Sequence, residues 1–543
     1  MVYAFTLPTT SPLSFQSFIF SSTHPSLPQS ASTARHALRL ALKSLKRLPR
    51  GPRQDAHLPT VLSALNEYLP YLFAISHGLS SRSARTDLLV AQDRDPSGSS
   101  SADLNPRTGE EIEVTLRAEL ESAWKPTLSA STAWSRRASA GTSGVNLIRS
   151  RGGRVSGHGI DFEIAFTLTT LGYVLSRLAR VKVIESLYAP VTPTAEQRAA
   201  ALQIATKYLL QASSVHTLLA SSPTFAAATS STVPDIDTAA QSALSSLALA
   251  EATLLAVLKD DAYTTACIQA RNPNDREWMV RAPEIPKVRA LLFSRLCVRA
   301  AEYAEQAAMG LGSIGSGSGR TSRVDEDVTH YAGVLSRVAR ARACRFFGVD
   351  AELAGKAGEG IAWLGAARSS LGLRGGAAAS SPAADEASAP RAKGGLSRLK
   401  REWTERREDR KIGKDASGSR SDNGPLDPGD DAGRDEEGRV ISMLETKWVR
   451  MNDTINTQLI PPSGPLLSNL PSGRDIHTPP AFYKPPSLDD DILVRMRAPP
   501  DETKDPQFRD DLDDSEEEDI PVGPREPLSG APDRSATASN VYY

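Results

Sequence analysis

The chain of 543 residues is 40% hydrophobic and carries a formal net charge of −1. Its length and apolar content allow one large or a few ordinary domains with a sizeable core. A net charge this small argues against a chain-wide field that would hold nucleic acid or an anionic membrane.

The first 80 residues are predicted to combine extended segments with two helices. Residues 3–20 scatter aromatic and leucine side chains among prolines, a pattern typical of short extended pieces. A helix is expected to begin after Ser32, its N-cap, and to end before Pro49. A second helix is expected over residues 59–79, with a kink at Pro70.

Several stretches are predicted to be irregular. Low-complexity inserts are expected at about residues 92–110, 310–324 and 372–438, which are rich in small and polar residues. Residues 111–124 are predicted to start as a strand and finish as a helix. The glycine- and arginine-rich residues 136–158 are expected to lack regular structure.

The clearest regular element is a helical hairpin over residues 161–219. Apolar residues recur at spacings of three and four, at Ile164, Leu168, Leu171, Leu175 and Leu178. After a break at Pro190, Thr194 and Gln197 have the spacing of a capping box for a second amphipathic helix. Two such helices bury their apolar faces against each other and against further helices, so the hairpin is scaffold.

Further helices continue this array. They are predicted after the cap signal at residues 235–237, over residues 286–308, 328–347 and 351–371, and around residues 441–455. Helical hairpins in series indicate a mainly α, solenoid-like stack without a fixed repeat length.

The C-terminal region is proline-rich and then acidic. Residues 458–488 hold too many prolines for a helix and too many apolar residues for a free linker, so they are expected to lie extended along the helical body. We therefore predict one domain over residues 1–499 and an acidic disordered tail over residues 500–543.

Signals of cellular location point to a cytoplasmic protein. The N-terminus lacks the basic start and apolar run of a signal peptide, and the most apolar helix, near residues 244–258, is too short and too polar for a membrane span. The cysteines have no CxxC spacing and are expected to be reduced, mostly buried thiols: Cys267, Cys297 and Cys344.

Apparent catalytic motifs lack their context, so no catalytic, cofactor-binding or metal-binding residue is predicted. Gly310, Gly312 and Gly315 fit GxGxxG, but they follow an alanine-rich helix where a nucleotide fold requires a strand. Ser397 and Lys400 fit SxxK without the partner motifs of that chemistry. The histidines form no HxH or HExxH pair for a metal.

Two charged segments are candidate sites. Residues 393–414 are basic but interleaved with carboxylates, which is more typical of a solvated helix than of a lipid-binding surface. Ser515 precedes three glutamates, a context that acid-directed kinases accept, although an inert solubilising tail explains the same residues.

The helix over residues 286–308 is the strongest candidate for a binding surface. One face is a row of mostly small residues for close helix packing: Ala290, Phe293, Cys297, Ala301 and Ala304. A second apolar row of Leu292, Leu296 and Tyr303 lies between Arg289 and Arg299. This row is either the wall of an exposed groove for a partner's amphipathic helix, with arginines for its acidic side chains, or an ordinary packing face.

The order of these segments resembles the BRO domain of ALIX-type ESCRT adaptors, and in particular its fungal ambient-pH branch. The resemblance is carried by residues 5–18 (FTLPTTSPLSFQSF), 162–179 (FEIAFTLTTLGYVLSRLA), 205–221 (ATKYLLQASSVHTLLAS), 295–307 (RLCVRAAEYAEQA) and 447–477 (KWVRMNDTINTQLIPPSGPLLSNLPSGRDIH). It implies a boomerang-shaped domain with TPR-like helical hairpins, a small N-terminal β-sheet and an extended C-terminal arm.

The resemblance also implies a function. It implies a non-enzymatic adaptor that binds the C-terminal amphipathic helix of the main ESCRT-III filament subunit. Such a protein works with other pH-pathway components at cortical plasma-membrane or endosomal sites, associating with membrane only through partners, toward proteolytic activation of the transcription factor PacC at alkaline pH. The alternative is a general factor for endosomal, multivesicular-body cargo sorting.

The partner-binding residues implied by the resemblance are Leu292, Leu296, Val257 and Arg299. In the family the groove uses aliphatic residues one turn apart on a helix ending in an AADY-like sequence, and here that helix ends AAEY at Tyr303. This chain departs from the pattern on the preceding helix, where Ala256 stands in place of a bulky aromatic residue.

Overall fold

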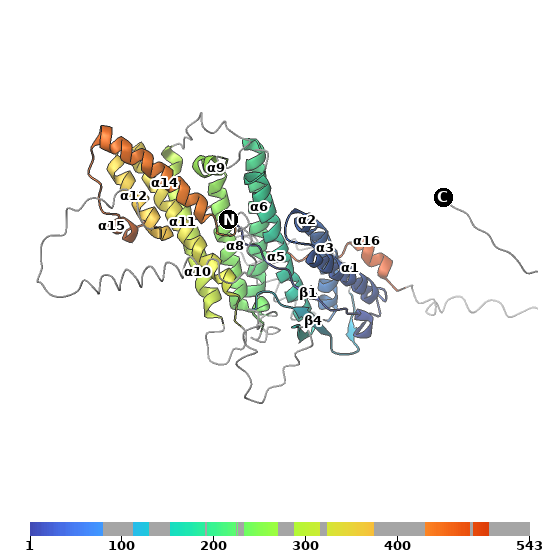
Figure 1. Cartoon of the computed structure of the whole chain (residues 1–543). Coiled ribbons are helices and arrows are strands. Elements are labelled where there is room, and N and C mark those ends of the chain that lie inside the picture. The colour runs from blue at the N-terminus through green and yellow to red at the C-terminus, as the bar shows by residue number, and fades with distance from the viewer. Residues whose placement is uncertain are drawn as a thin grey trace, which may run out of the picture. The chain divides into compact units, whose positions relative to one another are not determined.

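The computed structural model describes residues 1–79, 112–129, 153–189, 193–223, 225, 233–269, 287–314, 323–373, 429–477 and 482–498. Those from Met1 to Arg497 form one compact unit (Figure 1). The predicted insert 92–110, the basic segment 393–414 and the predicted tail with Ser515 lie outside the described residues.

Most of the described chain is helical, as predicted. The helices are α1 (Leu27–Arg47), α2 (Pro52–Asp55), α3 (Leu58–Leu79), α5 (Ile160–Leu187), α6 (Ala195–Ser221), α8 (Thr238–Leu258), α9 (Ala262–Gln269), α10 (Lys287–Ser313), α11 (Glu326–Leu353), α12 (Ala357–Leu371), α14 (Arg434–Met451), α15 (Ser463–Ser468) and α16 (Asp490–Met496). Each long helix from α5 to α14 packs on its neighbours along the chain (Figure 1). This is the predicted array of helical hairpins.

The hairpin of α5 and α6 forms as expected, and its capping box is present. Thr194 accepts from the backbone of Gln197, whose side chain accepts from the backbone of Thr194. Helix α5 is buried on more faces than its apolar stripe requires. Thr167 and Thr170 tolerate this burial because their hydroxyls donate to carbonyl oxygens four residues earlier in the same helix, at 2.8 and 2.7 Å.

Between the helices of this hairpin, His216 is a buried packing residue. Its Nδ1 lies 2.6 Å from Oε1 of Gln241, and its ring fills the space beside Gly172, where a Cβ would come within 2.5 Å of Nε2. Burial lowers the pKa of His216 to about 4.

Acidification is expected to destabilise the fold through His216. Because its folded pKa is lowered from 6.5 to about 4, the unfolded chain takes up a proton that the folded chain excludes. Its contribution to stability is complete above pH 6.5 and is lost as the pH falls, by about 2 kcal/mol between pH 7 and pH 5. Urea unfolding at both pH values should show this loss in the parent and a smaller one in His216→Asn; equal losses would contradict it.

The small N-terminal sheet is present, but it includes segments predicted otherwise. Strands β1 (Thr9–Thr10), β4 (Glu121–Lys125) and β5 (Val155–His158) form one antiparallel sheet in the order β1-β4-β5. Strands β2 (Ile19–Phe20) and β3 (Thr115–Leu116) pair separately. The prediction that residues 111–124 finish as a helix is therefore wrong. The prediction that residues 136–158 lack regular structure is wrong at β5. In β4 burial alternates, with Ser122 and Trp124 inward, which fits the strand period.

Several predicted boundaries also shift. The break predicted between residues 347 and 351 lies inside α11, and α12 begins only at Ala357. Helix α1 begins at Leu27, so Ser32 lies inside it and its hydroxyl bonds Pro28 O and the N–H of Phe15. Helix α10 continues through Gly310 to Ser313, so residues 310–313 of the predicted insert are helical. A Cβ at Gly310 would lie 3.0 Å from that of Ala243 on α8, so glycine permits the close approach of the two helices. Helix α14 already begins at Arg434, within the insert predicted to end at residue 438.

A buried carboxylate joins the sheet to the helices. Glu163, at the start of α5, accepts hydrogen bonds from Arg35 Nε at 2.8 Å, Tyr68 OH at 3.0 Å and Trp124 Nε1 at 2.7 Å. Burial alone would raise its pKa, but the Arg35 guanidinium and these hydrogen bonds hold the pKa of Glu163 below its usual value. We call these four residues the Glu163 cluster; they come from α1, α3, β4 and α5.

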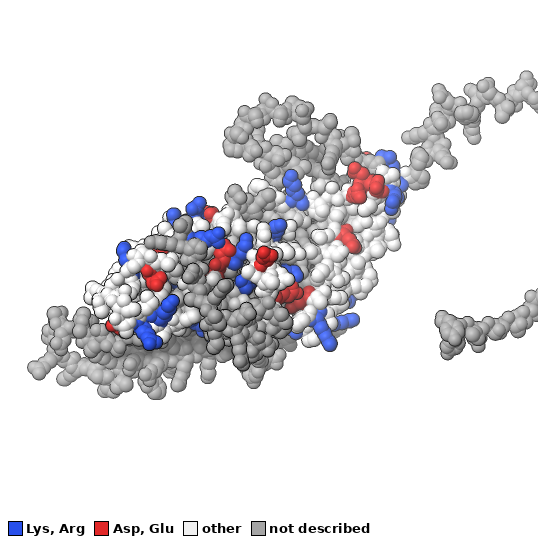
Figure 2. Space-filling view, turned by 90° about the horizontal axis from the view of Figure 1, so that it is seen from above, with Lys and Arg blue, Asp and Glu red and all other residues white. Residues whose placement is uncertain are grey.

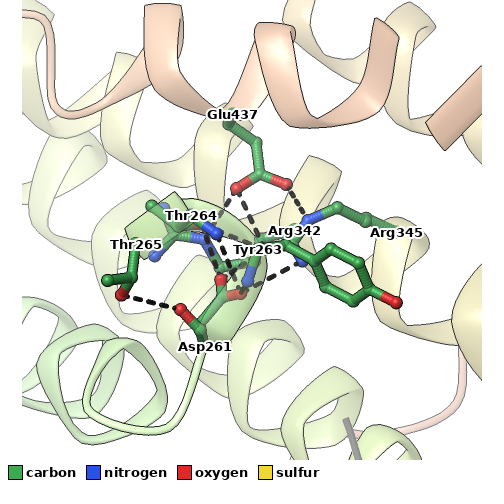
Figure 3. A network of polar contacts seen from close by, with 7 residues as sticks. All are labelled: Asp261, Tyr263, Thr264, Thr265, Arg342, Arg345 and Glu437. Atoms are coloured by element: carbon green, nitrogen blue, oxygen red, sulfur yellow. Dashed lines mark hydrogen bonds and ion pairs between the residues drawn. The ribbon is translucent and has the colours of Figure 1, made fainter. Parts of the chain in front are cut away.

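A second buried cluster holds α14 against α11 and the start of α9. Arg345 on α11 donates to Asp261 Oδ2 at 2.6 Å and to Glu437 Oε1 at 2.5 Å. Arg342, one turn earlier, donates to Glu437 Oε2 at 2.9 Å. Figure 3 shows the two arginines lying between Asp261 and Glu437. Asp261 also caps α9, accepting from the N–H groups of Tyr263 and Thr264. We call this the Arg345 cluster.

The described residues include one helix, α8, that is long and apolar enough to cross a membrane. Within its most apolar window 83% of the residues are buried inside the protein, which is the behaviour of a core helix. The thiols are mostly buried, as predicted. Cys297 and Cys344 lie in the core, where burial raises the pKa of each thiol to about 12, and Cys267 is half-buried.

Candidate partner-binding surface

Helix α10 presents the two predicted rows, and the small-residue row is wholly internal. Its five members are buried: Ala290, Phe293, Cys297, Ala301 and Ala304. This face packs against α8 and α11, the two helices that contact α10 most extensively. Small side chains allow this close approach of helices on both sides.

The second row is less open than a groove wall would be. Leu296 is only 1% exposed and belongs to the hydrophobic core, as does Val257 on α8 at 0%. Leu292 and Tyr303 are half-buried and pack against that core. Of the four residues implicated in partner binding, only Leu292 and Arg299 therefore offer their side chains to solvent. Of the two alternatives for this row, Leu296 therefore follows the packing face and not the exposed groove wall.

The proline-rich arm after α14 lies on the helical body, as predicted. A single π-helical turn (Asn452–Asn456) ends α14, and Gln458 then anchors the chain on the start of α12. The Gln458 side chain accepts from the N–H of Gly358 at 3.0 Å and donates to Gly355 O at 2.8 Å. The arm next forms the short helix α15, so the expectation that this stretch holds no helix is wrong there, and it continues without regular structure to residue 477.

Residues 472–477 of this arm, here named the strap, lie on α10 between Arg295 and Tyr303, at one end of the second row. The N–H of Arg474 donates to the carbonyl of Arg295 at 3.1 Å, and Arg295 Nε donates to Ser472 O at 3.3 Å. Gly473 lies directly on α10, where a Cβ would approach the backbone N and Cα of Arg299 to 2.7 Å. The strap thus needs glycine at this position.

The strap also places a carboxylate on the exposed end of the row. Asp475 Oδ1 accepts from Arg299 Nε at 2.8 Å and from Tyr303 OH at 2.7 Å. The Arg299 guanidinium lies 4.4 Å from the Tyr303 ring centroid and also bonds Glu302 at 2.8 Å. Partial burial would raise the pKa of Asp475, but the bonds from Arg299 and Tyr303 lower it.

This contact is a surface interaction of modest strength. The side chains of Arg299 and Asp475 are 34% and 51% exposed. An ion pair exposed to this degree contributes about 0–1 kcal/mol. The strap is therefore held by a few individually weak bonds rather than by core packing.

Charge on the surface is mixed. On the face seen in Figure 2, basic and acidic side chains of the described residues are interspersed among uncharged ones, and neither sign forms a continuous patch. Within the described residues, no group of three or more His, Cys, Asp or Glu side chains is placed to hold a metal ion.

Sequence reasoning found Arg299 and Tyr303 on α10 but missed their partner. The sequence predicts that the arm lies on the helical body, but it does not predict which residues of the arm contact α10. The signal that could have been used is Gly473 beside Asp475, because a small residue next to a carboxylate suits close contact with a helix that carries arginines.

These features define the class of the protein: an α-helical hairpin array with a small N-terminal sheet and an extended C-terminal arm. Among curated proteins, the pH-response regulator protein palC of Emericella nidulans is 56% identical over 547 residues, covering 100% of both chains. The chain belongs to the family of this regulator. No family model matches it.

Solved structures with a similar course of the chain are BRO domains. A structure described as an ALIX BRO1 CHMP4C complex has a TM-score of 0.42 at 13% identity, covering 91% of this chain and 97% of that one. A Bro1 domain studied for endosomal targeting has a TM-score of 0.41 at 13% identity, covering 91% and 95%. Both TM-scores are low, so the family assignment rests on the palC relative.

Proposed function

We propose that this protein is a non-enzymatic adaptor of fungal ambient-pH signalling that binds the C-terminal amphipathic helix of the main ESCRT-III filament subunit. In this proposal it is a cytoplasmic protein recruited through its partners to cortical plasma-membrane or endosomal sites. There it is required for proteolytic activation of PacC at alkaline pH. The observation that carries the proposal is the full-length 56% identity to a pH-response regulator.

The proposed binding surface is the second row of α10. Leu292 would supply the apolar contact and Arg299 would pair with an acidic side chain of the partner helix. Leu296 and Val257 would support the row from within the core, since both are buried. An amphipathic helix fits this surface because one of its faces is apolar and its margins are charged.

Leu292→Asp is expected to weaken binding of a synthetic ESCRT-III C-terminal helix by about 2–4 kcal/mol, because it places an unpaired charge in an apolar contact. Fluorescence anisotropy with the full chain measures this affinity. Leu291→Asp is the matched control: Leu291 is the preceding residue on α10, is 48% exposed and lies outside the row. Leu296→Asp is unsuitable, because a buried charge would impair folding first.

Equal binding by the parent and by folded Leu292→Asp would contradict the site assignment.

The phenotypes of mutant strains distinguish a role in pH signalling from the alternative role in general endosomal sorting. Deletion or Leu292→Asp should impair growth only at alkaline pH and leave PacC unprocessed. Defective multivesicular-body sorting of cargo at neutral pH would instead indicate a general endosomal factor.

A further inference from the structure

We infer that the strap is an internal competitor for the partner helix, with Asp475 occupying the Arg299–Tyr303 pair that the partner's acidic side chain would use. The inference rests on the proposed function and adds its regulation: the chain's own arm occupies the Arg299–Tyr303 end of the proposed binding surface. Binding then requires that the strap leave α10.

The geometry of Asp475 is that of a bound carboxylate. One oxygen accepts from both Arg299 Nε and Tyr303 OH, at 2.8 and 2.7 Å. Arg299 and Tyr303 are one turn apart on α10, so they present their donors on one face of the helix. A partner helix with an aspartate or glutamate beside its apolar face would satisfy the same two donors. Both carboxylates cannot occupy the pair together.

The strap covers the junction of two helices, not α10 alone. While Arg474 and Asp475 contact α10, the half-buried His477 imidazole lies beside the backbone of Ala252 on α8. Ala252 and Val257 belong to the same helix. The strap therefore lies beside α8 as well as α10.

The balance of forces permits exchange between the two occupants. The Arg299–Asp475 pair is substantially solvent-exposed, and Ser472, Arg474, Asp475 and Ile476 are themselves exposed. A competing segment of this kind reduces the apparent affinity by the fraction of molecules in which it is released. Weakening the strap should therefore tighten partner binding without changing any residue of α10.

Two variants release the strap in different ways. Asp475→Asn removes its charge, and Gly473→Ala places a Cβ against the Arg299 backbone, which cannot yield as a flexible side chain could. Each is expected to raise the affinity of the ESCRT-III helix peptide for the full chain about three- to tenfold. Asp453→Asn is the matched control: it removes one exposed acidic charge from the π-helical turn and should leave affinity unchanged.

A double variant tests competition for the same donors. In the Arg299→Gln background the gain from Asp475→Asn should disappear, because the group for which the two carboxylates compete is absent. Hydrogen exchange gives an independent readout. Saturating peptide should accelerate exchange at the Arg474 N–H, which the strap otherwise holds against Arg295 O.

The outcomes separate the two proposals. Peptide binding to parent and variants with equal affinity, with Arg474 protection retained in the complex, would overturn the strap and leave the adaptor function standing. Absence of binding even by Gly473→Ala and Asp475→Asn, with the fold intact by circular dichroism, would overturn the proposed partner as well.

Discussion

Arg345→Ala is expected to lower the free energy of unfolding by about 3–5 kcal/mol, because it leaves buried carboxylates without their cation. Arg345 is 0% exposed and bonds both Asp261 and Glu437. Only Glu437 retains a second arginine, Arg342. Denaturant unfolding with linear extrapolation measures the change.

Arg340→Ala is the control for this experiment. Arg340 lies on the same helix as Arg345, and the substitution removes its ion pair with Glu305. The side chains of Arg340 and Glu305 are 40% and 48% exposed. Its cost should be within about 1 kcal/mol. Adding Asp261→Asn to Arg345→Ala should restore part of the loss, because asparagine still caps α9 and removes one uncompensated charge. A loss from Arg345→Ala as small as that of Arg340→Ala would show that the cluster is not a source of stability.

Glu163→Ala is expected to cost a similar 3–5 kcal/mol. It leaves the Arg35 guanidinium, the Tyr68 hydroxyl and the Trp124 indole buried without their common acceptor. Glu185→Ala is the control on the same helix and removes an ion pair between Glu185 and Lys182, whose side chains are 57% and 37% exposed. It should lower the free energy of unfolding by less than about 1 kcal/mol. The two variants are compared by the same unfolding measurement.

The pH dependence provides a second test of Glu163. Because its folded pKa is lowered from 4.5, its contribution is present above pH 4.5 and is lost as the pH falls through the folded pKa. The parent should therefore lose stability in this acid range more steeply than Glu163→Ala. Parallel curves for the two proteins would contradict the ionised state of Glu163 in the fold.

The helical array could be predicted because its signals are local. The spacing of Ile164, Leu168 and Leu171 and the cap formed by Thr194 and Gln197 are properties of neighbouring residues, and both appear in the structure. The strands could not be predicted in this way, because strands of two to five residues show little periodicity and depend on partner strands far along the chain. Strand β5 lies within residues 136–158, which were expected to lack regular structure, and it pairs with β4.

The two ionic clusters and the strap were missed for the same physical reason. Arg345 and Glu437 are 92 residues apart and Arg35 and Glu163 are 128 apart, so sequence shows the charged types without showing the pairs. On α10, periodicity placed Leu292 and Leu296 in one row. It could not decide that Leu296 is core and Leu292 half-open, because burial depends on what the other helices and the arm cover.

The Arg345 cluster also sets an order on how the chain can be assembled at the ribosome. Glu437 is synthesised well after Arg342, Arg345 and Asp261, so until α14 emerges two guanidinium groups share one carboxylate. A nascent or truncated chain that ends at α12 holds an excess positive charge where its packed interior should close. Docking of α14 supplies the missing carboxylate, and the arm that follows α14 can then reach α10 and the proposed binding surface.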